Sequence, residues 1–130
     1  MGSITVATIN SVLGPVDTAA LGFTLSHEHV AIGAGGYPHS FPEFLDRDAT
    51  AERAVRDLTQ ARGEGVGTIV DMAPHDQGRD VLLQQEVSSR SGVNIIACSG
   101  SWLNIPSFFA LADPDRIADL YVREIEEGID

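Results

Sequence analysis

The sequence predicts an α/β fold, specifically a (β/α)8 TIM barrel of which this chain supplies an N-terminal hairpin and about three β/α units. Short strands that are apolar throughout alternate with helical segments, which favours parallel pairing with helices packed outside. The connections after strands are long and rich in Gly and Pro, at residues 31–44 and 101–112, whereas the helix-to-strand connection at residues 91–93 is short. Long βα loops and short αβ loops are typical of a β/α barrel, whose active site lies at the carboxyl ends of the strands.

The predicted hairpin occupies residues 4–30. Two β-rich segments flank the turn signal Gly14-Pro15, and the second segment carries the motif His27-Glu28-His29. The regular elements after the loop at 31–44 are predicted as helix, strand, helix, strand and helix, at residues 48–66, 67–72, 79–92, 93–100 and 113–128. Asp113 is the expected N-cap of the last helix, with Pro114 in its first turn and Gly128 at its end.

Composition limits the class of protein and its compartment. The 130 residues are 43% hydrophobic, enough for one globular domain. We expect no membrane span, since no apolar run approaches the roughly 18 residues required, and no signal peptide. Cys98 is the single cysteine, which excludes an intrachain disulfide framework and makes the cytoplasm the expected location. We interpret Cys98 as a small buried hydrophobe.

Charge excludes several kinds of partner and site. A net charge of −11 argues against nucleic acid or an anionic membrane surface as partner. All eight basic residues are arginine, so this chain cannot supply a Schiff-base lysine, a P-loop lysine or a lysine-derived metal ligand.

The chain is too short for a closed barrel. Eight β/α units need roughly 250 residues, and three units would leave sheet edges unpaired. Residues 1–130 are therefore expected to form a single incomplete domain, either a fragment or one part of a larger assembly. An open flavodoxin-like sheet would alternate in the same way, but residues 27–36 contain no phosphate-binding turn.

The histidine pair is the candidate metal site. Residues two apart in a strand point to the same face, so His27 and His29 should project together while Glu28 points toward the helices. Neutral imidazoles suit divalent Zn, Co, Ni or Fe, and such a metal lowers the pKa of bound water and polarises a carbonyl or phosphoryl oxygen.

Several segments together resemble the phosphotriesterase-like family of the amidohydrolase superfamily. They are "GPVDTAALGFTLSHEHV", "GVGTIVDM", "GRD", "NIIACSGSW" and "REIEEGI", which follow one another in the family's order over nearly all of the chain. The resemblance implies a (β/α)8 barrel with two divalent metal ions, expected to be Zn, with Co, Mn or Fe as alternatives. His27 and His29 would bind the more buried metal, and a hydroxide bridging the metals would attack phosphorus or a carbonyl carbon.

The same resemblance implies the rest of the site and its substrates. Trp102 matches an aromatic that lines the leaving-group side of the pocket, and the substrates would be phosphotriesters, lactones or related esters. The complete protein is expected to be a homodimer. The carboxylated lysine or glutamate that bridges the metals, two further histidines and an aspartate would follow residue 130, so no catalytic residue lies within this chain. We therefore expect weak or no metal retention and no catalysis from the chain alone. The rival interpretation is a non-catalytic half-barrel that associates with itself or with a complementary chain.

Other polar residues receive structural interpretations. His39 and His75 are expected to be surface histidines. Asp71, at the mouth of a strand, is expected to orient loop backbone or a group next to the metal ligands rather than to ligate directly. Arg79 and Asp80 are expected to pair locally or to cap the second helix.

Overall fold

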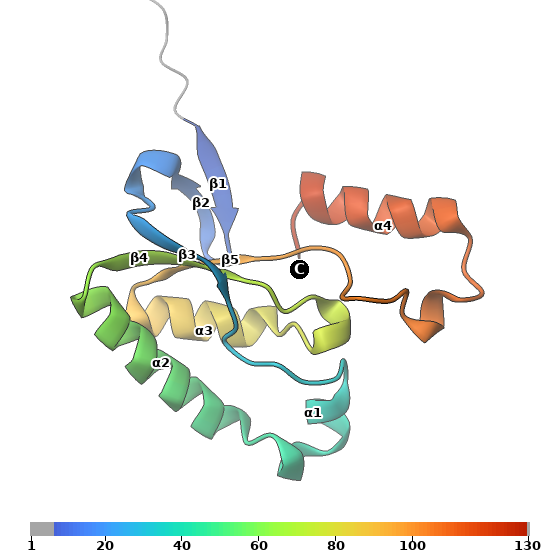
Figure 1. Cartoon of the computed structure of the whole chain (residues 1–130), viewed down its shortest axis with the longest axis horizontal. Helices are drawn as coiled ribbons and strands as arrows, with labels where there is room; N and C mark the ends of the chain where they lie inside the picture. The colour runs from blue at the N-terminus through green and yellow to red at the C-terminus, as the bar shows by residue number, and fades with distance from the viewer. Residues whose placement is uncertain (1–6, 130) are drawn as a thin grey trace, which may run out of the picture.

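A computed structural model of the chain describes residues 7–129. Its β-structure divides into an antiparallel hairpin and a parallel sheet (Figure 1). The hairpin consists of β1 (Thr8–Ser11) and β2 (Gly14–Asp17). The sheet has the order β3-β4-β5 and consists of β3 (Phe23–Glu28), β4 (Val66–Asp71) and β5 (Asn94–Ala97). The parallel α/β architecture predicted from the alternation of apolar strands and helices is thus confirmed.

Each strand of the sheet is followed by a helix. The helices are α1 (Tyr37–Ser40), α2 (Arg47–Gly63), α3 (Val81–Ser91) and α4 (Pro114–Glu126). Short 3-10 turns are η1 (Thr18–Ala20), η2 (Pro42–Phe44), η3 (His75–Gln77) and η4 (Ser107–Phe109). An aspartate begins each long helix because its carboxylate accepts a hydrogen bond from a free amide of the first turn: Asp46, Asp80 and Asp113. The predicted roles of Asp80 and Asp113 are confirmed.

The predicted turn at Gly14-Pro15 is wrong. These two residues begin β2, and the turn lies two residues earlier, at Val12 and Leu13 between Ser11 and Gly14. The Ser11 hydroxyl closes it by donating to the Gly14 carbonyl at 2.8 Å and accepting from the Leu13 amide at 3.2 Å. His27 therefore lies in a separate strand, β3, which η1 divides from the hairpin, and His29 directly follows that strand. Residues 4–6 of the predicted hairpin lie outside the described part.

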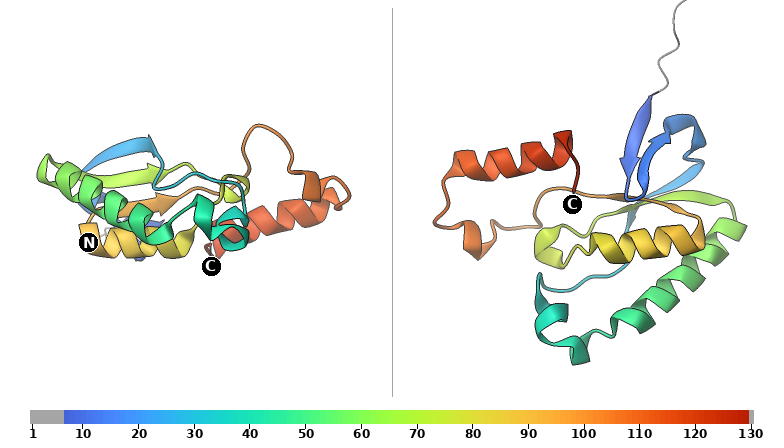
Figure 2. Two further views of the ribbon diagram at one scale, coloured as in Figure 1. Left: turned by 90° about the horizontal axis from the view of Figure 1, so that it is seen from below. Right: turned by 180° about the vertical axis from the view of Figure 1, so that it is seen from behind.

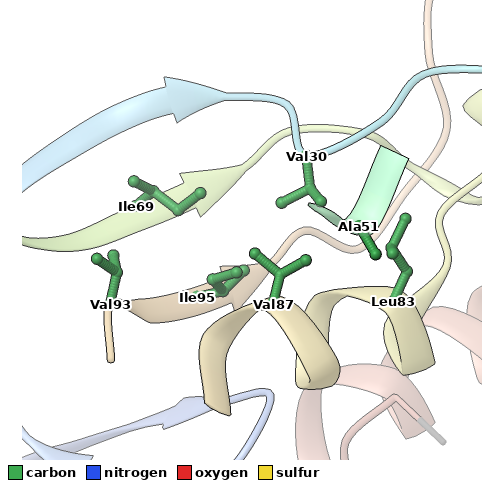
Figure 3. Packing of buried hydrophobic residues seen from close by; sticks show 7 residues of the cluster. All are labelled: Val30, Ala51, Ile69, Leu83, Val87, Val93 and Ile95. Carbon is green, nitrogen blue, oxygen red and sulfur yellow. The ribbon is translucent and has the colours of Figure 1, made fainter. Parts of the chain in front are cut away.

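Helices α2 and α3 cover one face of the sheet (Figure 2). The core forms where they meet it, and its buried side chains come from both sheet and helices (Figure 3). They are Val30, Ala51, Ile69, Leu83, Val87, Val93 and Ile95. Burial of this apolar surface is the main favourable term in the free energy of folding.

Helix α4 is held differently from α2 and α3. None of its residues is buried, and it lies to the side of the sheet (Figure 1). The guanidinium of Arg79 donates to both carboxylate oxygens of Glu124, at 2.5 and 3.1 Å, and also to the Cys98 carbonyl at 2.9 Å. Burial would raise the pKa of Glu124, but hydrogen bonds from Arg79 and Ser99 outweigh it and hold that pKa below its ordinary value. Of the two expected roles, Asp80 caps α3, and Arg79 pairs with Glu124 rather than with Asp80, so that it joins the loop after β4 to α4.

The sheet is open at its edges. Within residues 7–129 no strand pairs with the outer edge of β3, and the outer edge of β5 receives one backbone hydrogen bond, from Val12 to Ile95 at 2.9 Å. The described helices include none that is long and apolar enough to cross a membrane.

Two adjacent leucines of α3 test the core. Leu83 is 2% exposed and Leu82 is 71% exposed. We expect Leu83→Ala to lower the free energy of unfolding by about 2–5 kcal/mol, because it removes buried methyl groups and leaves a cavity. Leu82→Ala should change it by less than about 0.5 kcal/mol. Urea unfolding followed by circular dichroism measures both, and equal losses for the two variants would contradict this packing.

Candidate metal site at the carboxyl end of the sheet

The two histidines of the sequence motif lie side by side at the end of β3. The centroids of the His27 and His29 rings are 5.3 Å apart and the rings are inclined by 78°. Both residues reach solvent, and the His29 side chain is 29% exposed. Each imidazole is therefore accessible to a ligand from solvent.

A register shift in β3 determines which way these rings face. Leu25 lies opposite Ile69 of β4, but Glu28 lies opposite Asp71. Between these two pairs β3 therefore contains one residue more than β4. Leu25 packs against the core beneath α2 and α3. Strict alternation from Leu25 would turn His27 toward the helices as well.

The extra residue reverses that direction, as a β-bulge does. Glu28 shares the face of its partner Asp71, whose carboxylate contacts Gln84 of α3. Glu28 and the adjacent His29 also line a surface depression together with Arg53 and Asp57 of α2. His27 precedes Glu28 and so falls on the opposite face, which α2 and α3 leave uncovered (Figure 2). The expectation that Glu28 points toward the helices is confirmed.

Asp71 fixes the backbone around the histidines. It is 1% exposed, and its oxygens accept hydrogen bonds from the amides of Val30 and Ala73 at 3.1 and 2.9 Å and from the Gln84 side chain at 2.9 Å. Its Oδ1 lies 3.9 Å from the Nδ1 of His29. Because Val30 directly follows His29, this carboxylate ties the end of β3 to the end of β4. The expectation that Asp71 orients loop backbone is confirmed.

The described residues offer two imidazoles and no fuller ligand set. Within residues 7–129 no group of three or more His, Cys, Asp or Glu side chains is placed to hold a metal ion. Asp71 is the acidic group near His29, but its oxygens already serve three donors. The binding of metal by His27 and His29 remains a prediction.

Trp102 lies in the connection between β5 and α4, beyond the carboxyl end of β5. Its side chain is 60% exposed, and its backbone amide donates to both oxygens of Asp76, at 3.0 and 3.2 Å. Parallel strands end at the same edge of the sheet, so this connection starts on the side where the histidines lie. Its role in binding substrate likewise stays a prediction.

The remaining candidate residues, His39, His75 and Cys98, differ in their surroundings. His39 is exposed, as expected, whereas His75 is half-buried. Its Nε2 lies 3.0 Å from the Tyr121 hydroxyl, and its ring contacts Phe108 and Phe109. Burial raises the pKa of the half-buried Cys98 thiol, which keeps it protonated at neutral pH and agrees with a packing role.

Sequence reasoning missed the residues that hold the loops. The register shift in β3 leaves no mark in the pattern of side chains, because Ser26 and His27 are both polar. The acceptors for Trp102 and Arg79 lie 26 and 45 residues away in sequence, so no local pattern of residues predicts these contacts. The one available signal was the density of polar residues at 73–80, directly after a buried strand.

Replacing Asp71 tests its position beneath the histidines. Asp71→Ala should lower the free energy of unfolding by at least about 3 kcal/mol, since it leaves three donors without an acceptor and each costs about 1–3 kcal/mol. Asp119→Ala, which removes an exposed carboxylate of α4, should cost less than about 0.5 kcal/mol. Chemical unfolding compares them, and a loss for Asp71→Ala no larger than for Asp119→Ala would show that the carboxylate is not so placed.

Comparison with known proteins identifies the family of the chain. A family model described as "Phosphotriesterase family" matches residues 7–130. An aryldialkylphosphatase of Saccharolobus solfataricus is 32% identical over 116 residues, which are 88% of this chain and 37% of the relative. A phosphotriesterase homology protein of Mycobacterium tuberculosis is 34% identical (93% of this chain, 40% of the relative), and a phospho-furanose lactonase of Mycoplasmopsis agalactiae is 31% identical (94% and 36%). The chain therefore spans about two fifths of the length of these relatives, and over that length it belongs to the phosphotriesterase family.

Proposed function

We propose that this chain is the N-terminal part of a (β/α)8-barrel hydrolase that uses two divalent metal ions, with zinc as the expected metal, on phosphotriesters, lactones or related esters. The observation that carries the proposal is the approach of the His27 and His29 rings to 5.3 Å at the carboxyl end of a parallel strand. In β/α barrels this end of the sheet bears the active site. Family membership and the three successive β/α units support the same reading.

The residues present suit a metal in chemistry, though not in number. Two accessible neutral imidazoles are ligands that Zn²⁺ and its neighbours prefer. A divalent metal bound there would polarise a phosphoryl or carbonyl oxygen and lower the pKa of bound water. The bridging ligand and the remaining ligands would come from residues after 130, because the chain contains no lysine and the described residues hold no third ligand.

Within this proposal, the residues of this chain bind metal, position the backbone and line the pocket. His27 and His29 hold the more buried metal, and Asp71 keeps the backbone after His29 in place through the Val30 amide. Trp102 lines the leaving-group side of the pocket. General acid–base catalysis would belong to residues outside this chain.

The substrate class rests on the relatives and on charge. Relatives are named an aryldialkylphosphatase and a phospho-furanose lactonase, so the proposal covers phosphorus esters and lactones. The net charge of −11 opposes strongly anionic substrates and favours uncharged or weakly charged esters. A cytoplasmic location and a homodimeric complete protein belong to the same proposal.

A second candidate function is association without catalysis. Large apolar side chains are exposed on the β5–α4 connection and on α4, and the outer edge of β3 has no paired strand within residues 7–129. These side chains are Trp102, Leu103, Ile105, Phe108, Leu111, Val122 and Ile125. Such a surface would pair with the rest of a barrel, with a second copy or with a complementary chain.

Zinc titration of the 130-residue chain tests the histidine pair. We expect the ring resonances of His27 and His29 to shift together in NMR spectra while those of His39 and His75 stay in place, with weak binding and no ester turnover. His27→Ala or His29→Ala should reduce the zinc affinity by more than about tenfold, the loss seen even for groups next to a ligand. His39→Ala is the matched control and should bind as the parent does. Stoichiometric zinc that survives dialysis, with robust turnover, would refute the view that the site is incomplete.

Light scattering after gel filtration tests association. If the exposed apolar surface pairs, the chain should elute as a defined oligomer, and Leu111→Glu together with Ile105→Glu should shift it toward the monomer by placing charge on that surface. A parent chain that is monomeric at all concentrations measured would exclude self-association.

A further inference from the structure

We propose that Asp76 is a positioning residue that holds Trp102, through its backbone, at the carboxyl end of the sheet. The inference deepens the proposed function, on which the role of Trp102 as a pocket residue rests. Neither the family match nor the motifs assign a role to Asp76.

The contact itself is specific. The Trp102 amide donates to both carboxylate oxygens of Asp76, at 3.0 and 3.2 Å, across 26 residues of sequence. One amide shared between two carboxylate oxygens is a bifurcated hydrogen bond, so either oxygen of Asp76 can accept from Trp102. With 60% of its side chain exposed, Trp102 gains little from packing, so the backbone contact decides where this residue lies.

No other described hydrogen bond replaces this one. In the described part of the chain, the loop and side-chain hydrogen bonds of residues 100–105 consist of the pair from Trp102 to Asp76. On either side the connection is attached independently. Arg79 binds the Cys98 carbonyl, and His75 contacts the rings of Phe108 and Phe109. Asp76 is thus the middle of three attachments, all made by residues 75–79.

The backbone around Asp76 is held by hydrogen bonds and close packing. It lies in η3, whose Gln77 carbonyl accepts from the Gly33 amide at 2.9 Å and whose Gln77 amide donates to Pro74 at 2.9 Å. A Cβ added at Gly78, which has φ +79°, would meet the Gly33 carbonyl oxygen at 3.1 Å. The loop after β3 and the loop after β4 are therefore in close contact. Asp76 of η3 in turn contacts the loop after β5 through the Trp102 amide.

The single tryptophan makes the proposal measurable, because all tryptophan fluorescence of this chain comes from Trp102. We would record the time-resolved anisotropy of the metal-free 130-residue chain, its Asp76→Ala and Asp76→Asn variants, and a control, Asp57→Ala, that removes an exposed carboxylate of α2. Far-UV circular dichroism of each chain monitors the fold.

Asp76→Ala should raise the population of mobile Trp102 relative to bound Trp102 by roughly fivefold, which corresponds to the loss of about 1 kcal/mol of net hydrogen-bond energy. The amplitude of the nanosecond component of the anisotropy decay should increase as a result. Asp76→Asn keeps one acceptor oxygen and should behave nearly as the parent, as should Asp57→Ala. If Asp76→Ala alters the circular dichroism, the Asp76→Asn chain decides: parent-like motion supports the proposal and motion equal to that of Asp76→Ala overturns it. Unchanged Trp102 motion in a folded Asp76→Ala chain would also overturn it. The measurement needs neither metal nor substrate, so its outcome is separate from that of the hydrolase proposal.

Discussion

The extra residue in β3 is the constraint from which the site follows. Leu25 must face α2 and α3 because it packs against the core, and simple alternation would carry His27 to the same side. Between the paired positions, β3 advances by three residues while β4 advances by two. This bulge directs Glu28 toward α2, and the preceding residue, His27, toward the uncovered face. Both requirements, an apolar contact beneath the sheet and two imidazoles near its end, are thereby met within one short strand.

Acidic side chains then fix the connections at the same end of the sheet. Asp71 joins the ends of β3 and β4, Asp76 holds the middle of the β5–α4 connection, and Glu124 binds Arg79. Each acts on a backbone amide or a guanidinium rather than on another side chain of its own element. These three carboxylates therefore stabilise loop positions.

The sequence predicted what depends on periodicity and local chemistry. The order of strands and helices, the caps at Asp80 and Asp113 and the tie made by Asp71 followed from apolar spacing and from carboxylates placed at element ends. It did not predict what depends on distant partners. The contacts of His75 and Arg79 were missed because Tyr121 and Glu124 lie 46 and 45 residues away. The predicted turn at Gly14-Pro15 was wrong for a local reason, since the Ser11 hydroxyl closes the turn two residues earlier. The proposed metal role of the histidines and the proposed barrel depend on partners that the described residues do not include.

The direction of the His27 ring is the most direct test of the whole account. In a ¹³C-edited NOESY spectrum of the 130-residue chain, the ring protons of His27 should show cross-peaks to the ring protons of His29, whose centroid lies 5.3 Å away. They should show none to the methyl groups of Leu25 and Ile69, which face the helices. Cross-peaks from His27 to those methyl groups, without any to His29, would mean that β3 keeps strict alternation and that the two imidazoles cannot share a metal.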